Sequence, residues 1–292
     1  MKTPRRKVLS AIAGVSALPF GTSVAALPTK ADWQEYSEEK WPSVFLNLDP
    51  EEEFRQIMRI QRSLHDDDLI LHWYHFIMVA VVPGMSPIPV VRWEGIEISH
   101  HRLVGPDLYR LHGHNLSFPR DMETGEFTHS VINPITGKRV SPGTLALIED
   151  PGYFRSPKGT IPLESAEEGF RPTYKKLRRE GDMIKVDAIR VPPPTWPATF
   201  IEMGHEGVSA ALFEDHSRLW LPADVSGGYI FPYPDWMEMG DSPGHMFATW
   251  SGYKLRSVDQ LPQEFQRRAR AERPELLQVD LAQFEREVKL PL

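Results

Sequence analysis

Two histidines at alternate positions of one segment offer the clearest chemistry in the chain. His112 and His114 flank Gly113 in the stretch 108–118, whose composition predicts a β-strand. Because side chains alternate along a strand, both imidazoles and Arg110 should share one face. Two such imidazoles can exchange protons with a substrate or act as metal ligands. The pattern is equally typical of the polar outer face of a half-buried strand, so both interpretations stay open.

A second candidate pair, Asp241 and His245, lies on either side of Pro243-Gly244. In such a turn the carboxylate could fix the imidazole tautomer, and the imidazole could exchange a proton with a substrate. Asp241 could instead cap the turn through a local hydrogen bond, while His245 only begins the next strand. Trp236 and Met239, just before the pair, would form an apolar, adaptable wall.

The aromatic stretch 69–82 predicts a further strand with candidate ligand contacts. His72 and His75 then point to opposite faces, and the one that faces the interior needs a hydrogen-bond partner or a role. A paired surface glutamate is the simpler interpretation of Glu94. The residues expected to contact a ligand are His72, Trp73, Tyr74, Trp93, Glu94, Arg110, Trp236 and Met239.

The sequence supplies no complete cofactor or metal motif. It contains no cysteine, which excludes thiolate nucleophiles and iron–sulfur clusters, and it has no HExxH, Gly-x-Ser-x-Gly or dinucleotide-binding pattern. We therefore expect no organic cofactor. If a metal ion binds, its ligands should include His112 and His114, although a third ligand is not evident.

The elements that must position these residues are mostly strands. Asp49 and Pro50 predict the start of a helix that runs to about Leu64. Strands are predicted at 69–82, 88–98, 108–118, 126–132, 183–191, 199–211 and 245–255, an ordered loop at 141–173, and helices at 262–270 and 281–290. This order predicts a mainly β domain, an antiparallel barrel-like or strongly curved sheet with helices at its N- and C-terminal ends.

Composition indicates a globular protein with one large domain, expected at 49–292 after an extension at 26–48. The 292 residues include 33 Lys and Arg against 40 Asp and Glu, which gives a net charge of −7. Such an acidic chain, without a long basic run, argues against nucleic acid as a partner.

Residues 1–25 have the order of an export signal. Four basic residues precede the mildly apolar stretch 8–18, which is too short to span a bilayer, and Ser23-Val24-Ala25 fits a cleavage site, with a cut one residue later as the alternative. Adjacent Arg5 and Arg6 favour the twin-arginine export machinery over general secretion. The mature protein is then expected outside the cytoplasm, in the periplasm.

Several short segments resemble the bacterial and fungal family known as domain of unknown function 1838. They are 90–95, 123–126, 133–138, 252–255 and 261–262, together with Met239-Gly240-Asp241-Ser242-Pro243-Gly244-His245, and the resemblance extends over 50–277. It implies a β-rich, barrel-like domain of calycin type and twin-arginine export, but no reaction. The stretch 144–151 lacks a histidine and an asparagine that relatives often carry.

Together these features predict an exported acid–base enzyme, an isomerase, lyase or cyclase, that acts on a small hydrophobic or aromatic molecule in a barrel cavity. His112, His114 and His245 would carry protons, and Asp241 would orient an imidazole. One alternative is a ligand-binding protein of the same fold that catalyses nothing. The other is a hydrolase with a histidine-ligated metal ion.

Overall fold

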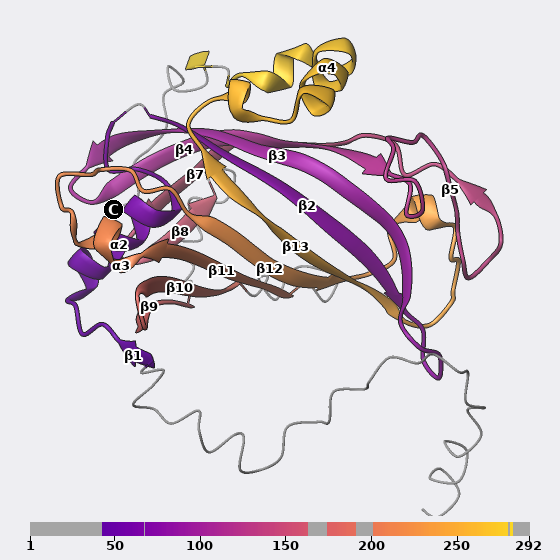
Figure 1. Ribbon diagram of the computed structural model, residues 1–292, viewed down its shortest axis with the longest axis horizontal. Helices are drawn as coiled ribbons and strands as arrows, with labels where there is room; N and C mark the ends of the chain where they lie inside the picture. The colour runs from indigo at the N-terminus through magenta and orange to yellow at the C-terminus, as the bar shows by residue number, and fades with distance from the viewer. Residues whose placement is uncertain (1–42, 67, 163–173, 191–200, 280, 283–292) are drawn as a thin grey trace, which may run out of the picture. The chain divides into compact units, whose positions relative to one another are not determined.

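The computed structural model describes residues 43–66, 68–162, 174–190, 201–279 and 281–282, all within one compact unit (Figure 1). The export signal, most of the expected N-terminal extension and most of the helix expected at 281–290 lie outside the described residues. None of the helices described is long and apolar enough to cross a membrane.

Eleven of the thirteen described strands form one antiparallel sheet. Its order is β1 (Ser43–Phe45), β9 (Tyr174–Glu180), β10 (Met183–Arg190), β11 (Ile201–Ser209), β12 (Asp224–Phe231), β13 (His245–Leu255), β2 (Leu69–Val81), β3 (Ile88–Gly105), β4 (Leu108–Arg120), β7 (Leu145–Ser156) and β8 (Gly159–Pro162). The predicted mainly β, antiparallel fold is confirmed. The sheet is open, however, with β1 and β8 at its edges, so a closed barrel is not the correct description.

The helix expected from Pro50 is α2 (Pro50–Gln61), which ends before Leu64. The Asp49 carboxylate accepts a hydrogen bond from the backbone N–H of Glu52 at 2.9 Å, as an N-cap should. On one side of α2, Ile57 and Ile60 pack in a cluster with residues of β9, β10 and β11. On its other side, Met58 packs with Tyr109 and Leu111 of β4.

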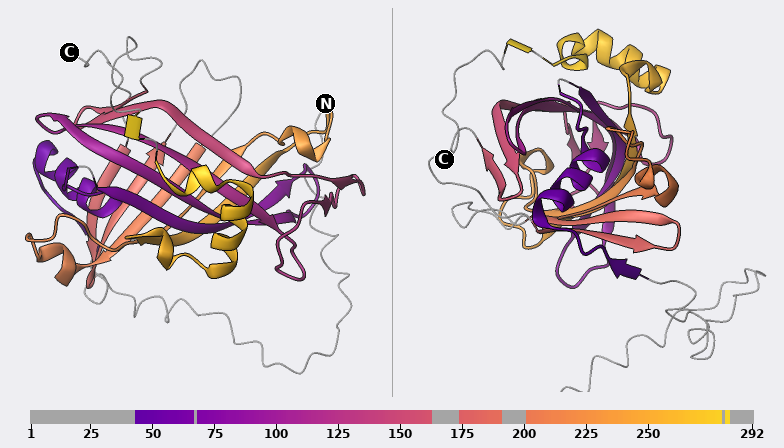
Figure 2. Two further views of the ribbon diagram at one scale, coloured as in Figure 1. Left: turned by 90° about the horizontal axis from the view of Figure 1, so that it is seen from above. Right: turned by 90° about the vertical axis from the view of Figure 1, so that its left-hand side faces the viewer.

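These two sets of contacts explain the curvature of the sheet. Four strands separate β11 from β4 in the sheet order, so one helix can contact both only if the sheet bends around it. Figure 2 shows α2 on the concave side of the sheet. The Gln61 side chain also connects α2 to two strands. Its amide oxygen accepts hydrogen bonds from Arg155 of β7 at 3.2 Å and from Lys175 of β9. We call the concave face the inner face.

The convex, outer face carries α4 (Gln263–Glu272), close to the expected 262–270. Phe265 and Ala269 of α4 pack against Leu71, Ile98 and other residues of β2, β3 and β4. Shorter elements are β5 (Val131–Ile132) and β6 (Arg139–Val140), which form a separate small sheet, α3 (Ala210–Glu214), and the 3₁₀ turns η2 (Asp235–Met237), η3 (Val258–Gln260) and η4 (Pro274–Leu277).

Two predicted segments require correction. The stretch 141–173 is not a loop throughout, because β6 ends before it and both β7 and β8 lie within it. Gly152 has a φ of 96°, and the pairing of β4 with β7 shifts register near this point. A β-bulge therefore accommodates Pro151-Gly152 within the strand, where the sequence suggests a turn. The strand expected at 126–132 is reduced to β5 and one isolated bridge between Arg120 and Phe127.

Candidate functional site

The predicted catalytic residues lie at two ends of the sheet. In the pairing register, His112 lies opposite His100, and His114 opposite Ile98, which faces Leu71 near the start of β2. His245 lies opposite Val81 at the end of β2. The ten steps from Leu71 to Val81 span about 33 Å at about 3.3 Å per residue. The structure therefore does not bring these histidines together in one site.

His112 and His114 do share a face with Arg110, as the strand alternation predicts, and this face is the outer one. The Nε2 atom of His114 lies 2.6 Å from the backbone oxygen of Leu276, and burial lowers the pKa of His114. No group of three or more His, Asp or Glu residues is placed to hold a metal ion in the part of the chain that the structure describes. Their role as proton carriers or ligands stays a prediction.

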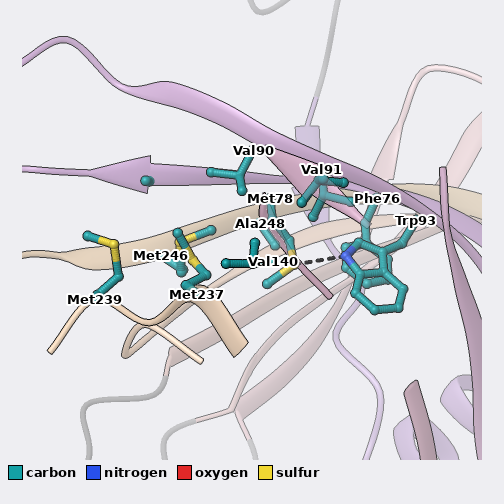
Figure 3. Packing of buried hydrophobic residues seen from close by; sticks show 12 residues of the cluster. Phe76, Met78, Val90, Val91, Trp93, Val140, Met237, Met239, Met246 and Ala248 are labelled. Atoms are coloured by element: carbon teal, nitrogen blue, oxygen red, sulfur yellow. Dashed lines mark hydrogen bonds between the residues drawn. The ribbon is translucent and has the colours of Figure 1, made fainter. Parts of the chain in front are cut away.

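Asp241 is exposed and His245 is half-buried, and no hydrogen bond to either side chain is present among the described residues. The segments around them have a structural function. Asn133 is fully buried, and its amide nitrogen donates to the backbone oxygen of Met237 at 2.7 Å, which joins the turn 133–137 to η2. Trp236 and Met239 pack in the same apolar cluster as Trp93, part of which is shown in Figure 3.

The remaining predicted ligand contacts divide between the two faces. His72, Tyr74 and Trp93 lie on the inner face, as their cross-strand partners show. Trp73 and Glu94 lie on the outer face, where the indole N–H of Trp73 donates to Glu94 at 3.1 Å. Glu94 also binds Arg120 at 2.5 Å. Glu94 is thus paired, but the prediction of a surface glutamate is wrong, because the pair is buried.

A group of charged side chains that the sequence analysis did not identify lies on the inner face, beside the C-terminal end of α2. We call it the inner cluster; its members are Gln61, Arg62, His72, Glu97, Arg155, Glu206 and Lys254. Its central ion pair joins Arg62 to Glu97 at 2.7 Å. The Nδ1 atom of His72 lies 3.3 Å from Nη1 of Arg62 and 4.0 Å from Oε1 of Glu97.

The environment of the inner cluster shifts the pKa values of His72 and Glu97. Burial is the main reason that the pKa of His72 falls from 6.5 to about 3, and neighbouring cations lower it further. Burial opposes ionisation of Glu97, but Arg62, His72 and Arg155 outweigh it and lower the pKa of Glu97 to about 2. His72 is thus neutral and Glu97 ionised at neutral pH. The side chain of Glu97 keeps 29% exposure, so its carboxylate faces accessible space.

Glu206 behaves in the opposite way. Burial raises the pKa of Glu206 above its ordinary value, although Lys175, Arg62, Lys254 and Arg155 counteract part of the effect. Its Oε1 atom accepts a hydrogen bond from the Gln61 amide at 2.8 Å. Its Oε2 atom has no hydrogen-bond partner among the described residues, and the same is true of Nε2 of His72. Buried polar atoms without partners are rare and call for an explanation.

Lys254 supports the cluster from β13. Its ammonium group donates to the backbone oxygens of Arg59 at 3.0 Å and Ile60 at 2.8 Å, and also to that of Arg62, and it thereby satisfies the end of α2. Burial lowers the pKa of Lys254 well below its ordinary value. Beside the cluster, a cavity of about 120 Å³ lies between α2 and strands β7 to β9, and Arg155 and Lys175 line it.

Aromatic side chains continue the inner face beyond the cluster. We call them the aromatic band: Tyr74, Phe76, Trp93, Tyr229, Phe231 and Trp250. The hydroxyl of Tyr74 lies 3.1 Å from the Ser117 hydroxyl and donates to Asn115 at 3.2 Å. Tyr74, Tyr229 and Trp250 are only half-buried, so part of each ring is accessible. The band therefore offers apolar surface next to the two carboxyl groups.

The sequence carried a signal for the missed residues, but an ambiguous one. Glu97 lies on the same face of β3 as Gly95, and Glu206 lies on the same face of β11 as Gly204. The faces of both glutamates therefore follow from strand alternation once the strands are known. Which face is inner depends on α2 and α4, and thus on tertiary contacts.

Residues 217–288 match the model of a family described as Protein of unknown function (DUF1838), which confirms the predicted resemblance over this part of the chain. The match includes Trp250 and Lys254 of the inner face, as well as Asp241 and His245. No curated protein matches the chain.

Proposed function

We propose that this protein is an exported enzyme that moves a proton on a small, partly apolar molecule bound at the inner face. The proposal keeps the expected class of chemistry, an isomerase, lyase or cyclase without an organic cofactor. It assigns the chemistry to the inner cluster instead of to His112, His114, Asp241 and His245. The observation that carries it is the pair Glu97 and Glu206, two carboxyl groups near the same cations with pKa shifts of opposite sign.

Glu206 is the proposed proton carrier. A carboxyl group whose pKa is raised toward neutrality can donate a proton to a substrate and take one back. The residue is half-buried, and rotation about its last side-chain bond can present either oxygen. Glu97 stays ionised and holds Arg62, which in turn contacts Nδ1 of His72.

His72 is the proposed hydrogen-bond donor to the substrate. The Arg62 guanidinium can only donate, so Nδ1 of His72 accepts and the ring proton resides on Nε2. Since His72 stays neutral, this buried N–H can bind a carbonyl oxygen on which negative charge develops. The aromatic band would hold the apolar part of the molecule, and α2 would complete a calycin-like cavity in the open sheet.

Solvent deuterium exchange tests the proposal without knowledge of the product. Small aromatic ketones such as phenylacetone and 2-tetralone are first screened for binding by thermal shift. Ketones that bind are then incubated with the protein in D₂O. The C–H bond next to the carbonyl breaks, its proton passes to Glu206, and a solvent deuteron returns, so proton NMR records loss of that signal. The Glu206→Gln variant should exchange at least about a hundredfold more slowly, with little change in affinity.

Glu214→Gln is the matched control, because Glu214 is exposed and pairs only with Arg179 at the surface among the described residues. Binding without exchange in the wild-type protein would contradict the enzyme and favour a ligand-binding protein. Exchange that needs a metal ion, and that His112→Ala abolishes but Glu206→Gln does not, would favour a metal site at His112 and His114.

A further inference from the structure

A groove of about 490 Å³ lies across β11, β12, β13 and β2; most of its lining residues are on the outer face and none belongs to the inner cluster, although Gly227 and Trp250 also border it. One row of directly paired residues crosses it from β11 to β2: His205, Ser226, Ser251 and His75. Directly paired residues of antiparallel strands point to the same side of a sheet. The groove therefore presents two imidazoles and two hydroxyl groups in a line.

Both imidazoles are held by neighbouring side chains. Nδ1 of His205 lies 2.8 Å from Oδ1 of Asp187, whose other oxygen binds Arg178 at 2.6 Å. Because the Asp187 carboxylate can only accept, Nδ1 of His205 donates to it, which leaves Nε2 to contact a ligand. On β2, Nε2 of His75 lies 3.1 Å from the hydroxyl of Ser251.

Apolar surface lies between these polar groups. The ring of Phe247 lies against Gly228, where a Cβ atom would be only 3.1 Å from the ring. Phe247 is half-buried, so the rest of its ring borders the groove. Ile77 and Met203 flank it, and Met203 is 39% exposed. Apart from the two histidines, the lining residues described are uncharged.

We infer that this groove binds a neutral saccharide. A sugar ring combines an apolar C–H face, which fits against Phe247, with a rim of hydroxyl groups that match His205, Ser226 and Ser251 as donors and acceptors. A purely apolar ligand would displace water from Nε2 of His205 and from the Ser226 hydroxyl without replacing those hydrogen bonds. An ionic ligand would lack an opposite charge, since Asp187 is already paired.

Saturation-transfer NMR with cellobiose, maltose and N,N′-diacetylchitobiose tests the inference. Transfer to at least one of these sugars is expected, with an affinity in the millimolar range. His205→Ala and Phe247→Leu should each weaken binding by about tenfold or more. His216→Ala is the matched control, because His216 is exposed and does not line the groove. Thermal unfolding of each variant verifies that the fold is retained.

Two results would overturn the inference. One is the absence of transfer to all three sugars by the folded wild-type protein. The other is binding that neither variant weakens, which would place the sugar elsewhere. Indole serves as a competitor: if it binds in a manner sensitive to Phe247→Leu and no sugar displaces it, the groove is a site for aromatic molecules. None of these results depends on Glu206, so this site is tested independently of the proposed enzyme.

Discussion

The response of the protein to acid should depend on the buried imidazole of His72. Its pKa in the folded state is about 3, against 6.5 for an ordinary histidine. Between these values the unfolded chain binds a proton that the folded protein does not, so the free energy of unfolding falls as the pH falls. One such proton changes the slope by at most about 1.4 kcal/mol per pH unit. We expect His72→Gln to remove this contribution.

Urea denaturation of wild type and His72→Gln at several pH values between 6.5 and 4.5 measures the difference. Glu97, with a pKa of about 2 against 4.5, begins to lose its own contribution only toward the lower end of this window. Glu206 has a raised pKa and acts with the opposite sign, because its contribution is lost as the pH rises. The variant must therefore be compared with the wild type. His216→Gln is the exposed control, and equal slopes for wild type and His72→Gln would contradict a neutral, buried His72.

Individual residues also show where sequence reasoning ends. Strand alternation correctly separates His72 from His75, since one is buried and the other exposed. It does not identify Glu97, because β3 is covered by α4 on one face and borders the inner cluster on the other. A strand buried on both faces has no polar and apolar alternation from which an inner side could be inferred.

At the scale of single elements, α2 depends on a lysine nearly two hundred residues away in the sequence. Lys254 is the donor to three backbone oxygens at the end of this helix. Lys254→Met keeps most of the side-chain volume but leaves these buried acceptors without that donor. We expect a loss of about 2–4 kcal/mol in the free energy of unfolding, measured by urea denaturation.

Lys185→Met is the control, because Lys185 forms a partly exposed ion pair with Glu180 at 2.6 Å. Exposed pairs contribute about 1 kcal/mol or less, so this variant should be close to the wild type. Equal losses of unfolding free energy in the two variants would show that the contacts of Lys254 with α2 stabilise the protein no more than an exposed ion pair does. Trp220, whose ring lies 4.8 Å from the Lys254 ammonium, offers a fluorescence readout of the local change.

The elements themselves were predictable where their composition was typical of strands. The β2, β3, β4 and β13 strands are rich in aromatic and β-branched residues and lie where expected. The sequence does not predict the β12 strand, because Gly227-Gly228 is unusual in a strand interior. Its reason is tertiary: a Cβ atom on Gly227 would lie 2.6 Å from the Trp250 indole, so the glycine makes room for a ring of the aromatic band.

At the scale of the whole molecule, the sequence indicates a curved sheet but not how its open edges are protected. Closure of a barrel is one way to protect the edges of a sheet. This chain places α2 between the two sides of the sheet, with Gln61 bonded to β7, β9 and β11 at once. Contacts among residues 61, 155, 175 and 206 are remote in sequence, and no local pattern encodes them.

The inner cluster bears on the predicted route of export. Its charged and polar residues come from the end of α2 and from β2, β3, β7, β11 and β13, and buried charges are tolerated only when all partners are in place. A chain with such an interior benefits from folding before it crosses the membrane. The twin-arginine machinery transports proteins that are already folded. The motif Arg5-Arg6 lies outside the described residues, and its function is therefore a prediction from the sequence.

Replacement of Arg5 and Arg6 by lysine should abolish export while the charge of the segment is unchanged, because the machinery reads the arginine pair itself. Fractionation of the producing bacterium should find the wild-type protein in the periplasm with Ala26 or Leu27 as its first residue, and the double variant in the cytoplasm with its signal intact. Lys2→Arg with Lys7→Arg is the matched control and should be exported. If the double variant still reaches the periplasm, the general secretory route carries an unfolded chain, and the inner cluster must assemble after transport.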